Sequence, residues 1–198
     1  MNESPFAVRP HDKMKEVLLY PDSPGPSEHY YMIRGGSKKG NITVWESGTV
    51  GPEGSGEYIK TYGHYHVDDL PEIYWTLGGE GIVLLQKRVE DNGEPINDRI
   101  EEFKAVFVEK GHELHIPPRW GHLVVNIGDT HLITKDDSPV AGFGDLASMP
   151  MHADYKPVQE MKGFAYFVVE HNGKPALVRN KNYKEIQKED LAGLPVIS

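Results

Sequence analysis

The sequence predicts an all-β protein whose sheets form a sandwich or a barrel. Short runs rich in β-branched and aromatic residues recur along most of the chain, and glycine, proline or asparagine separates them. The helical stretches that would join parallel strands are missing between these runs. The run 73–77 also alternates in the period of two that a strand requires. A closed sheet of this kind can hold one small ligand in its interior.

The first 28 residues are expected to form an extended N-terminal arm. They contain five prolines and show little hydrophobic periodicity, which is typical of irregular or extended chain. We expect the arm to pack across a sheet or a neighbouring subunit. Because exchanged arms are common in dimers, we also expect a homodimer.

Residues 29–175 are expected to form the barrel, and residues 176–198 a C-terminal tail. Asp91-Asn92-Gly93 predicts a hairpin turn, because Asn-Gly readily adopts positive φ. Residues 181–191 have the apolar spacing of a short amphipathic helix. No linker-like composition divides the 198 residues, so we expect a single domain. The expected strands are 30–33, 41–45, 58–62, 73–77, 82–85, 103–108, 114–116, 123–127 and 164–169.

Composition excludes several classes of function. The chain has no cysteine, which excludes disulfides, iron–sulfur clusters and thiolate zinc sites, so any metal must be bound by histidine and carboxylate. A formal charge of −9 argues against nucleic acid as a partner. The sequence has neither the roughly 20 apolar residues that cross a bilayer nor the features of a signal peptide. We therefore expect no membrane association and a cytoplasmic location.

The strongest candidate site begins with two histidines in Gly63-His64-Tyr65-His66. In a strand, His64 and His66 project from one face about 6.6 Å apart, close enough for both imidazoles to bind one ion. Residues 68–71 read as a turn, which can bring Glu72 alongside them. His122 would arrive from a strand distant in sequence. This set predicts one divalent metal ion per chain (Fe, Mn, Ni, Co or Zn) with positions left open for substrate.

Each candidate residue also has a purely structural interpretation. With ten histidines, some close spacing arises by chance, and most single histidines are surface or hydrogen-bonded groups. The joint arrangement of the four residues favours a metal site. Tyr74 shares the predicted face of Glu72 and is a second candidate catalytic residue. His115 is either a contact near the site or a structural hydrogen-bonding group, and we expect only one of His112 and His115 to face inward.

Two motifs resemble those of the cupin superfamily. The first comprises Gly63, His64, His66, Glu72 and Gly79; the second comprises Gly111, Pro117, His122 and Asn126, with Arg119 at a position where the motif has glycine. The resemblance implies a double-stranded β-helix, or jelly-roll barrel. It leaves the reaction open, because this fold serves many chemistries.

More narrowly, the chain resembles the cupin-type phosphoglucose isomerases known mainly from archaea. The similarity runs from about Thr43 to Gly173 and includes 61–66, 72–74, 116–122 and 125–129. The resemblance implies metal-dependent interconversion of glucose 6-phosphate and fructose 6-phosphate, a reaction of glycolysis and gluconeogenesis. A small phosphorylated sugar is then the substrate. The segment 135–139 departs from the family, whose sequence in this region is Tyr-Pro-Ala-Asp.

The resemblance also assigns roles to individual residues. It makes His64, His66, Glu72 and His122 the metal ligands, and Glu72 a proton shuttle as well. Thr43, Thr61 and Gly63 are placed against the sugar phosphate. His152 and Tyr155 partly match a His-Asp-Tyr segment that helps to hold the phosphate in the family.

Two other functions fit the same four ligands. A metal-dependent dioxygenase also needs open coordination positions, and consumption of O₂ distinguishes it from an isomerase. A non-catalytic cupin that binds sugar is the third possibility.

Overall fold

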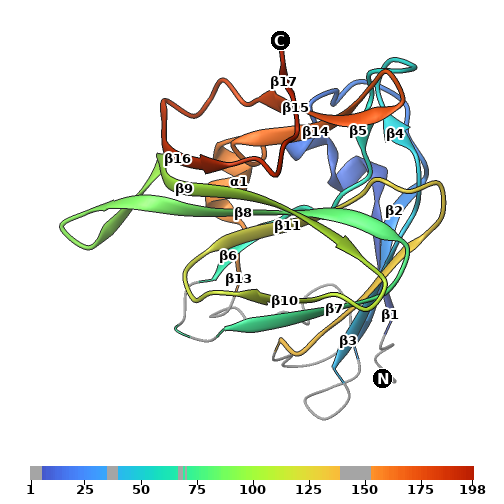
Figure 1. Ribbon diagram of the computed structural model, residues 1–198, viewed down its shortest axis with the longest axis horizontal. Coiled ribbons are helices and arrows are strands. Elements are labelled where there is room, and N and C mark those ends of the chain that lie inside the picture. The colour runs from blue at the N-terminus through green and yellow to red at the C-terminus, as the bar shows by residue number, and fades with distance from the viewer. Residues whose placement is uncertain (1–5, 35–39, 67–68, 70, 139–152) are drawn as a thin grey trace.

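The computed structural model describes residues 6–34, 40–66, 69, 71–138 and 153–198, and strands dominate these residues (Figure 1). This confirms the predicted all-β class. The strands are β1 (Phe6–Pro10), β2 (Glu28–Arg34), β3 (Asn41–Trp45), β4 (Thr49–Val50), β5 (Glu57–Tyr58), β6 (His64–His66), β7 (Glu72–Gly78), β8 (Glu80–Asp91), β9 (Glu94–Glu109), β10 (Glu113–Ile116), β11 (Gly121–Asn126), β12 (Leu132–Asp136), β13 (Ala153–Asp154), β14 (Tyr166–His171), β15 (Lys174–Arg179), β16 (Glu185–Asp190) and β17 (Val196–Ile197). The helical elements are η1 (His11–Lys13), η2 (Lys15–Val17) and α1 (Lys156–Glu160).

Two six-stranded sheets make up the barrel. The first has the order β1-β2-β3-β12-β7-β10 and the second the order β13-β6-β11-β8-β9-β16. Each presents one face to the interior: in β3, for example, Asn41, Thr43 and Trp45 are buried while the residues between them are partly exposed. The non-consecutive strand order of both sheets is that of a jelly roll, and their neighbouring strands are antiparallel except for β9 and β16. A smaller third sheet, β17-β15-β14-β5-β4, lies at one end of the barrel (Figure 1).

The described part of the N-terminal segment packs on its own barrel and forms one strand, β1, followed by short helical turns. This strand pairs with β2 at the edge of the first sheet, and the two 3₁₀ turns η1 and η2 follow it. Met14 and Val17 are fully buried in these turns. A buried ion pair of Glu57 and Lys60 fixes the segment: Lys60 Nζ donates to the Val17 carbonyl at 2.7 Å, and Glu57 accepts the Leu19 N–H at 2.7 Å.

The predicted C-terminal helix over 181–191 is wrong. These residues contain the strand β16, which pairs in parallel with β9. Tyr183 anchors the segment, because its hydroxyl donates to the Gly163 carbonyl at 3.0 Å. Ion pairs also connect β16 to β9; for example, Lys188 Nζ lies 2.8 Å from Glu102 Oε1. Backbone pairing with an open sheet edge therefore outweighs the weak helical spacing of this sequence.

The predicted strand over 58–62 is only partly confirmed. Regular pairing covers Glu57 and Tyr58, after which the chain leaves the third sheet to run beside β11. Thr61 N–H donates to the Val124 carbonyl at 2.9 Å. The predicted hairpin turn is confirmed, with positive φ at Asn92 and Gly93. Within the described residues, no helix is both long and apolar enough to cross a membrane.

Candidate metal centre

Four side chains meet inside the barrel, between the two large sheets. The ligand atoms of His64, His66, Glu72 and His122 all lie within 4.8 Å of one another. Glu72 Oε2 is 3.0 Å from His66 Nε2 and 3.1 Å from His122 Nε2. His122 Nε2 is also 3.1 Å from Nε2 of both His66 and His64. All four predicted metal ligands are thus brought together.

Both sheets contribute to this cluster. His64 and His66 lie on β6 and His122 on β11, directly opposite His64 in the second sheet. Glu72 opens β7 in the first sheet and reaches across the interior. Gly63 makes the entry into β6 possible: its φ is +81°, and a Cβ there would lie 2.9 Å from the Phe164 ring.

The four residues fit a divalent cation. An imidazole nitrogen carries at most one hydrogen, so His122 Nε2 cannot donate to the three ligand atoms that surround it. A cation among them would take up their lone pairs. Ligands about 2.1 Å from a metal lie about 3.0 Å apart when they occupy neighbouring octahedral positions. Four of the six pairs of ligand atoms here are 3.0–3.1 Å apart. Three nitrogens and one oxygen suit Fe, Mn, Ni, Co or Zn.

The electrostatics of Glu72 suit a metal ligand. Burial raises the pKa of the Glu72 carboxyl group, but the charge of His122 and hydrogen bonds from His122 and His66 outweigh it. They hold the pKa of Glu72 well below its ordinary value. The carboxylate is therefore ionised at neutral pH, although only 2% of the residue is exposed.

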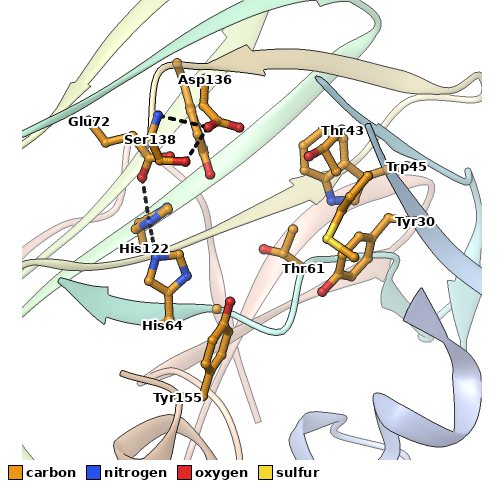
Figure 2. Close-up of a pocket in the computed structure, with 13 residues that line it drawn as sticks. Tyr30, Thr43, Trp45, Thr61, His64, Glu72, His122, Asp136, Ser138 and Tyr155 are labelled. Atoms are coloured by element: carbon orange, nitrogen blue, oxygen red, sulfur yellow. Dashed lines mark hydrogen bonds and ion pairs between the residues drawn. The ribbon is translucent and has the colours of Figure 1, made fainter. Parts of the chain in front are cut away.

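A pocket opens from the cluster along the barrel interior (Figure 2). His64, His122 and Glu72 form one end of it. Figure 2 shows Thr61 between this end and an opposite wall formed by Thr43, Trp45 and Tyr30. The remaining lining residues are Met32, Gly63, Tyr74, Asp136, Ser138 and Tyr155.

The other predicted site residues are placed as follows. Tyr74 lies beside the cluster, with its ring centroid 5.4 Å from that of His122. Thr43, Thr61 and Gly63 line the pocket, and Tyr155 lies at its mouth with its ring 5.3 Å from that of His64. His152 lies outside the described residues.

Of the two alternatives for His115, the structure favours a hydrogen-bonding group. His115 lies on the outer face of β10, and its Nε2 is 2.7 Å from Glu113 Oε1. His112 is also exposed, so neither of these histidines approaches the cluster. Asn126, by contrast, is fully buried and donates to two backbone carbonyls, as expected of a core amide.

Sequence reasoning missed five residues of the pocket: Tyr30, Met32, Trp45, Asp136 and Ser138. A signal for Asp136 was present. In β12 the buried residues Leu132, Thr134 and Asp136 alternate with partly exposed ones, so strand periodicity places Asp136 on the inner face.

Taken together, the jelly-roll barrel and its internal cluster of three histidines and one glutamate define a protein of the cupin class with a candidate metal site. A family model described as glucose-6-phosphate isomerase matches residues 25–187. The chain belongs to the glucose-6-phosphate isomerase family.

Individual relatives agree with this assignment. The glucose-6-phosphate isomerase of Pyrococcus furiosus is 33% identical over 162 residues, which cover 78% of this chain and 71% of the relative. The glucose-6-phosphate isomerase of Pyrococcus abyssi is 32% identical over 180 residues, which cover 87% of this chain and 80% of the relative. Among solved structures, an oxalate decarboxylase of Bacillus subtilis aligns over 56% of this chain and 21% of its own, with 16% identity and a TM-score of 0.33. The fold assignment rests on the strand order instead.

Proposed function

We propose that the protein is a metal-dependent sugar-phosphate isomerase that interconverts glucose 6-phosphate and fructose 6-phosphate. The observation that carries the proposal is the four-ligand cluster at the end of a polar pocket, in a chain of the glucose-6-phosphate isomerase family. This reaction belongs to glycolysis and gluconeogenesis. We place it in the cytoplasm, in keeping with a cysteine-free chain.

The reaction moves a hydrogen between two adjacent carbons that both carry oxygen. A bound divalent ion supplies Lewis-acid stabilisation of the negative charge that develops on those oxygens. Glu72 is the carboxylate that can accept and return the proton, since it lies at the end of the pocket where the reacting carbons would sit. Tyr74, beside His122, can orient Glu72 or the sugar through its hydroxyl group.

The rest of the pocket would hold the remainder of the sugar phosphate. Thr43 and Thr61 present hydroxyl groups, and Gly63 allows close approach of the backbone. We propose that these three residues contact the phosphorylated end, with Tyr155 at the pocket mouth. His152 is proposed to contribute to the same subsite.

Thr43→Val is expected to raise KM for fructose 6-phosphate about fivefold and to leave kcat nearly unchanged. The substitution removes a single hydrogen-bonding hydroxyl, worth about 1 kcal/mol, and conserves shape. Steady-state kinetics measure the split between KM and kcat. Thr134→Val is the matched control: Thr134 lies opposite Thr43 in the neighbouring strand, is buried, and does not line the pocket. Equal effects of the two substitutions would contradict a substrate contact at Thr43.

The proposed activity is tested by metal analysis of the purified protein, followed by an isomerase assay in both directions. One divalent ion per chain and loss of turnover after chelation, restored by adding metal, are the expected results. Consumption of O₂ without isomerisation would assign the site to a dioxygenase instead. Sugar binding without any turnover would leave a binding protein.

We propose that the protein forms a homodimer through the outer face of the first sheet. Strand alternation places Val44, Ile133 and Trp75 on this face, and Ile33 and Leu77 are 41% and 44% exposed there. Adjacent strands bring these apolar side chains together, and a second copy of the same face is self-complementary. Sedimentation velocity tests the proposal. A dimer with a Kd of about 1 μM is mostly associated at about 50 μM, so a monomer at that concentration would contradict the proposal.

A further inference from the structure

Asp136 is a buried carboxylate that the proposed reaction does not use. It ends β12, is only 3% exposed, and lines the same pocket as Glu72. Figure 2 shows the hydrogen bonds that Ser138 makes to its carboxyl group. A charged group is costly to bury, so its position in the wall of a pocket calls for a reason.

Strand register places Asp136 relative to the reacting end of the pocket. In the first sheet β12 lies between β3 and β7, and Asp136 is directly opposite Asn41 on one side and Tyr74 on the other. Glu72 precedes Tyr74 by two residues and faces the same interior. Diagonal neighbours of this kind are about 7–8 Å apart, a separation that the carbon chain of a sugar can bridge.

Hydrogen bonds hold the Asp136 carboxylate in one orientation. Its Oδ1 accepts from Asn41 Nδ2 at 2.7 Å, from the Ser138 N–H at 3.1 Å and from Ser138 Oγ at 2.5 Å. Three donors on one oxygen favour the ionised form. An ionised carboxylate can only accept hydrogen bonds, and the donors on a sugar are its hydroxyl groups. A phosphate group placed here would be repelled.

We propose that Asp136 is a substrate-binding residue that accepts a hydrogen bond from a hydroxyl group of the sugar, at C3 or C4. The inference rests on the proposed isomerase function and extends it. The pocket then has two parts. Asp136, held by Asn41 and Ser138, forms a wall that binds sugar hydroxyl groups, and a separate subsite binds the phosphate. The lining residues that the structure describes include no lysine or arginine. A hydrogen bond from a sugar hydroxyl group to Asp136 would therefore give the pocket a charged contact with the sugar that these residues do not otherwise provide through a cation.

The test combines Asp136→Asn with deoxygenated substrates. The kcat/KM of the wild-type protein is measured with glucose 6-phosphate and with its 3-deoxy and 4-deoxy analogues, and the measurement is repeated with the variant. A charged acceptor makes one hydroxyl worth about 10-fold to 100-fold in kcat/KM. The wild type is expected to lose this factor with one of the two analogues, whereas Asp136→Asn is expected to discriminate less than threefold between that analogue and glucose 6-phosphate.

Asp137→Asn is the matched control. Asp137 carries the same charge at the next position but is exposed, and its Oδ1 accepts the Ile73 N–H at 2.8 Å. It is expected to retain the full wild-type penalty for the deoxy analogue. Ser138→Ala, which keeps the carboxylate and removes one hydrogen bond to it, is expected to give a smaller loss and supplies a second variant if Asp136→Asn is unstable to heating.

The outcomes separate this inference from the function on which it rests. A wild-type protein that does not isomerise glucose 6-phosphate overturns the proposed function. Wild-type activity with an equal deoxy penalty in wild type and Asp136→Asn overturns the inference alone. A gain in kcat/KM for glucose 6-phosphate in Asp136→Asn also overturns it, since the carboxylate would then face the phosphate.

Discussion

Glu72→Gln is expected to lower kcat/KM for isomerisation by about 10⁴-fold. The change keeps the shape of the side chain but removes both the negative charge that faces three imidazoles and the group that accepts a proton. Each role alone is worth about 10²-fold or more, and here one carboxylate serves both. Rapid-mix assays with fructose 6-phosphate measure the loss, and metal content is measured on the same sample.

Glu113→Gln is the control for this substitution. Glu113 lies on the outer face of the same sheet, where it contacts His115 and the Trp75 indole. The change is expected to alter kcat/KM less than twofold. Full activity in Glu72→Gln would show that the assigned base is wrong, whereas an inactive variant that still binds one metal ion per chain would point to the proton transfer.

His122→Ala is expected to reduce bound metal from one ion per chain to less than one-tenth, with loss of turnover. His122 Nε2 lies within 3.1 Å of the other three ligand atoms, so its removal opens the centre of the cluster. A ligand that binds only the folded state raises its stability, so the wild-type melting temperature is expected to fall on chelation. The melting temperature of the variant is expected not to respond to chelator.

His115→Ala supplies the comparison for His122→Ala. This residue is exposed and paired with Glu113, far from the ligand atoms. Metal content, turnover and the response to chelator are expected to match those of the wild type. Retention of one tightly bound ion by His122→Ala would remove His122 from the ligand set.

The metal cluster could be predicted from the sequence because it depends on local rules. Strand periodicity alone places His64 with His66, and Glu72 with Tyr74. The contribution of His122 required a second motif, and its register opposite His64 emerges only from the folded sheet. Arg119 stands at a position where this motif has glycine. Its φ is 64°, so the backbone here has the left-handed conformation that glycine adopts readily.

The failures have a common physical cause, which is pairing between segments distant in sequence. The run 181–191 has few apolar residues, and its strand conformation is imposed by β9, some eighty residues earlier. His115 could be assigned to a face only with the pairing of β10 and β7. The partner of Asp136 that is distant in sequence, Asn41, is brought to it only by the pairing of β12 with β3.

The position of β16 affects how this protein behaves at high concentration. An unpaired sheet edge can recruit strands from other molecules, and long β9 would offer such an edge along much of its length. β16 occupies it with a strand in which Glu185, Lys188, Glu189 and Asp190 carry charge. A second copy of the protein that approached this edge of the sheet with its own β16 would bring the same charged side chains against these. We therefore expect the C-terminal segment to oppose edge-to-edge association of strands, independently of the chemistry inside the barrel.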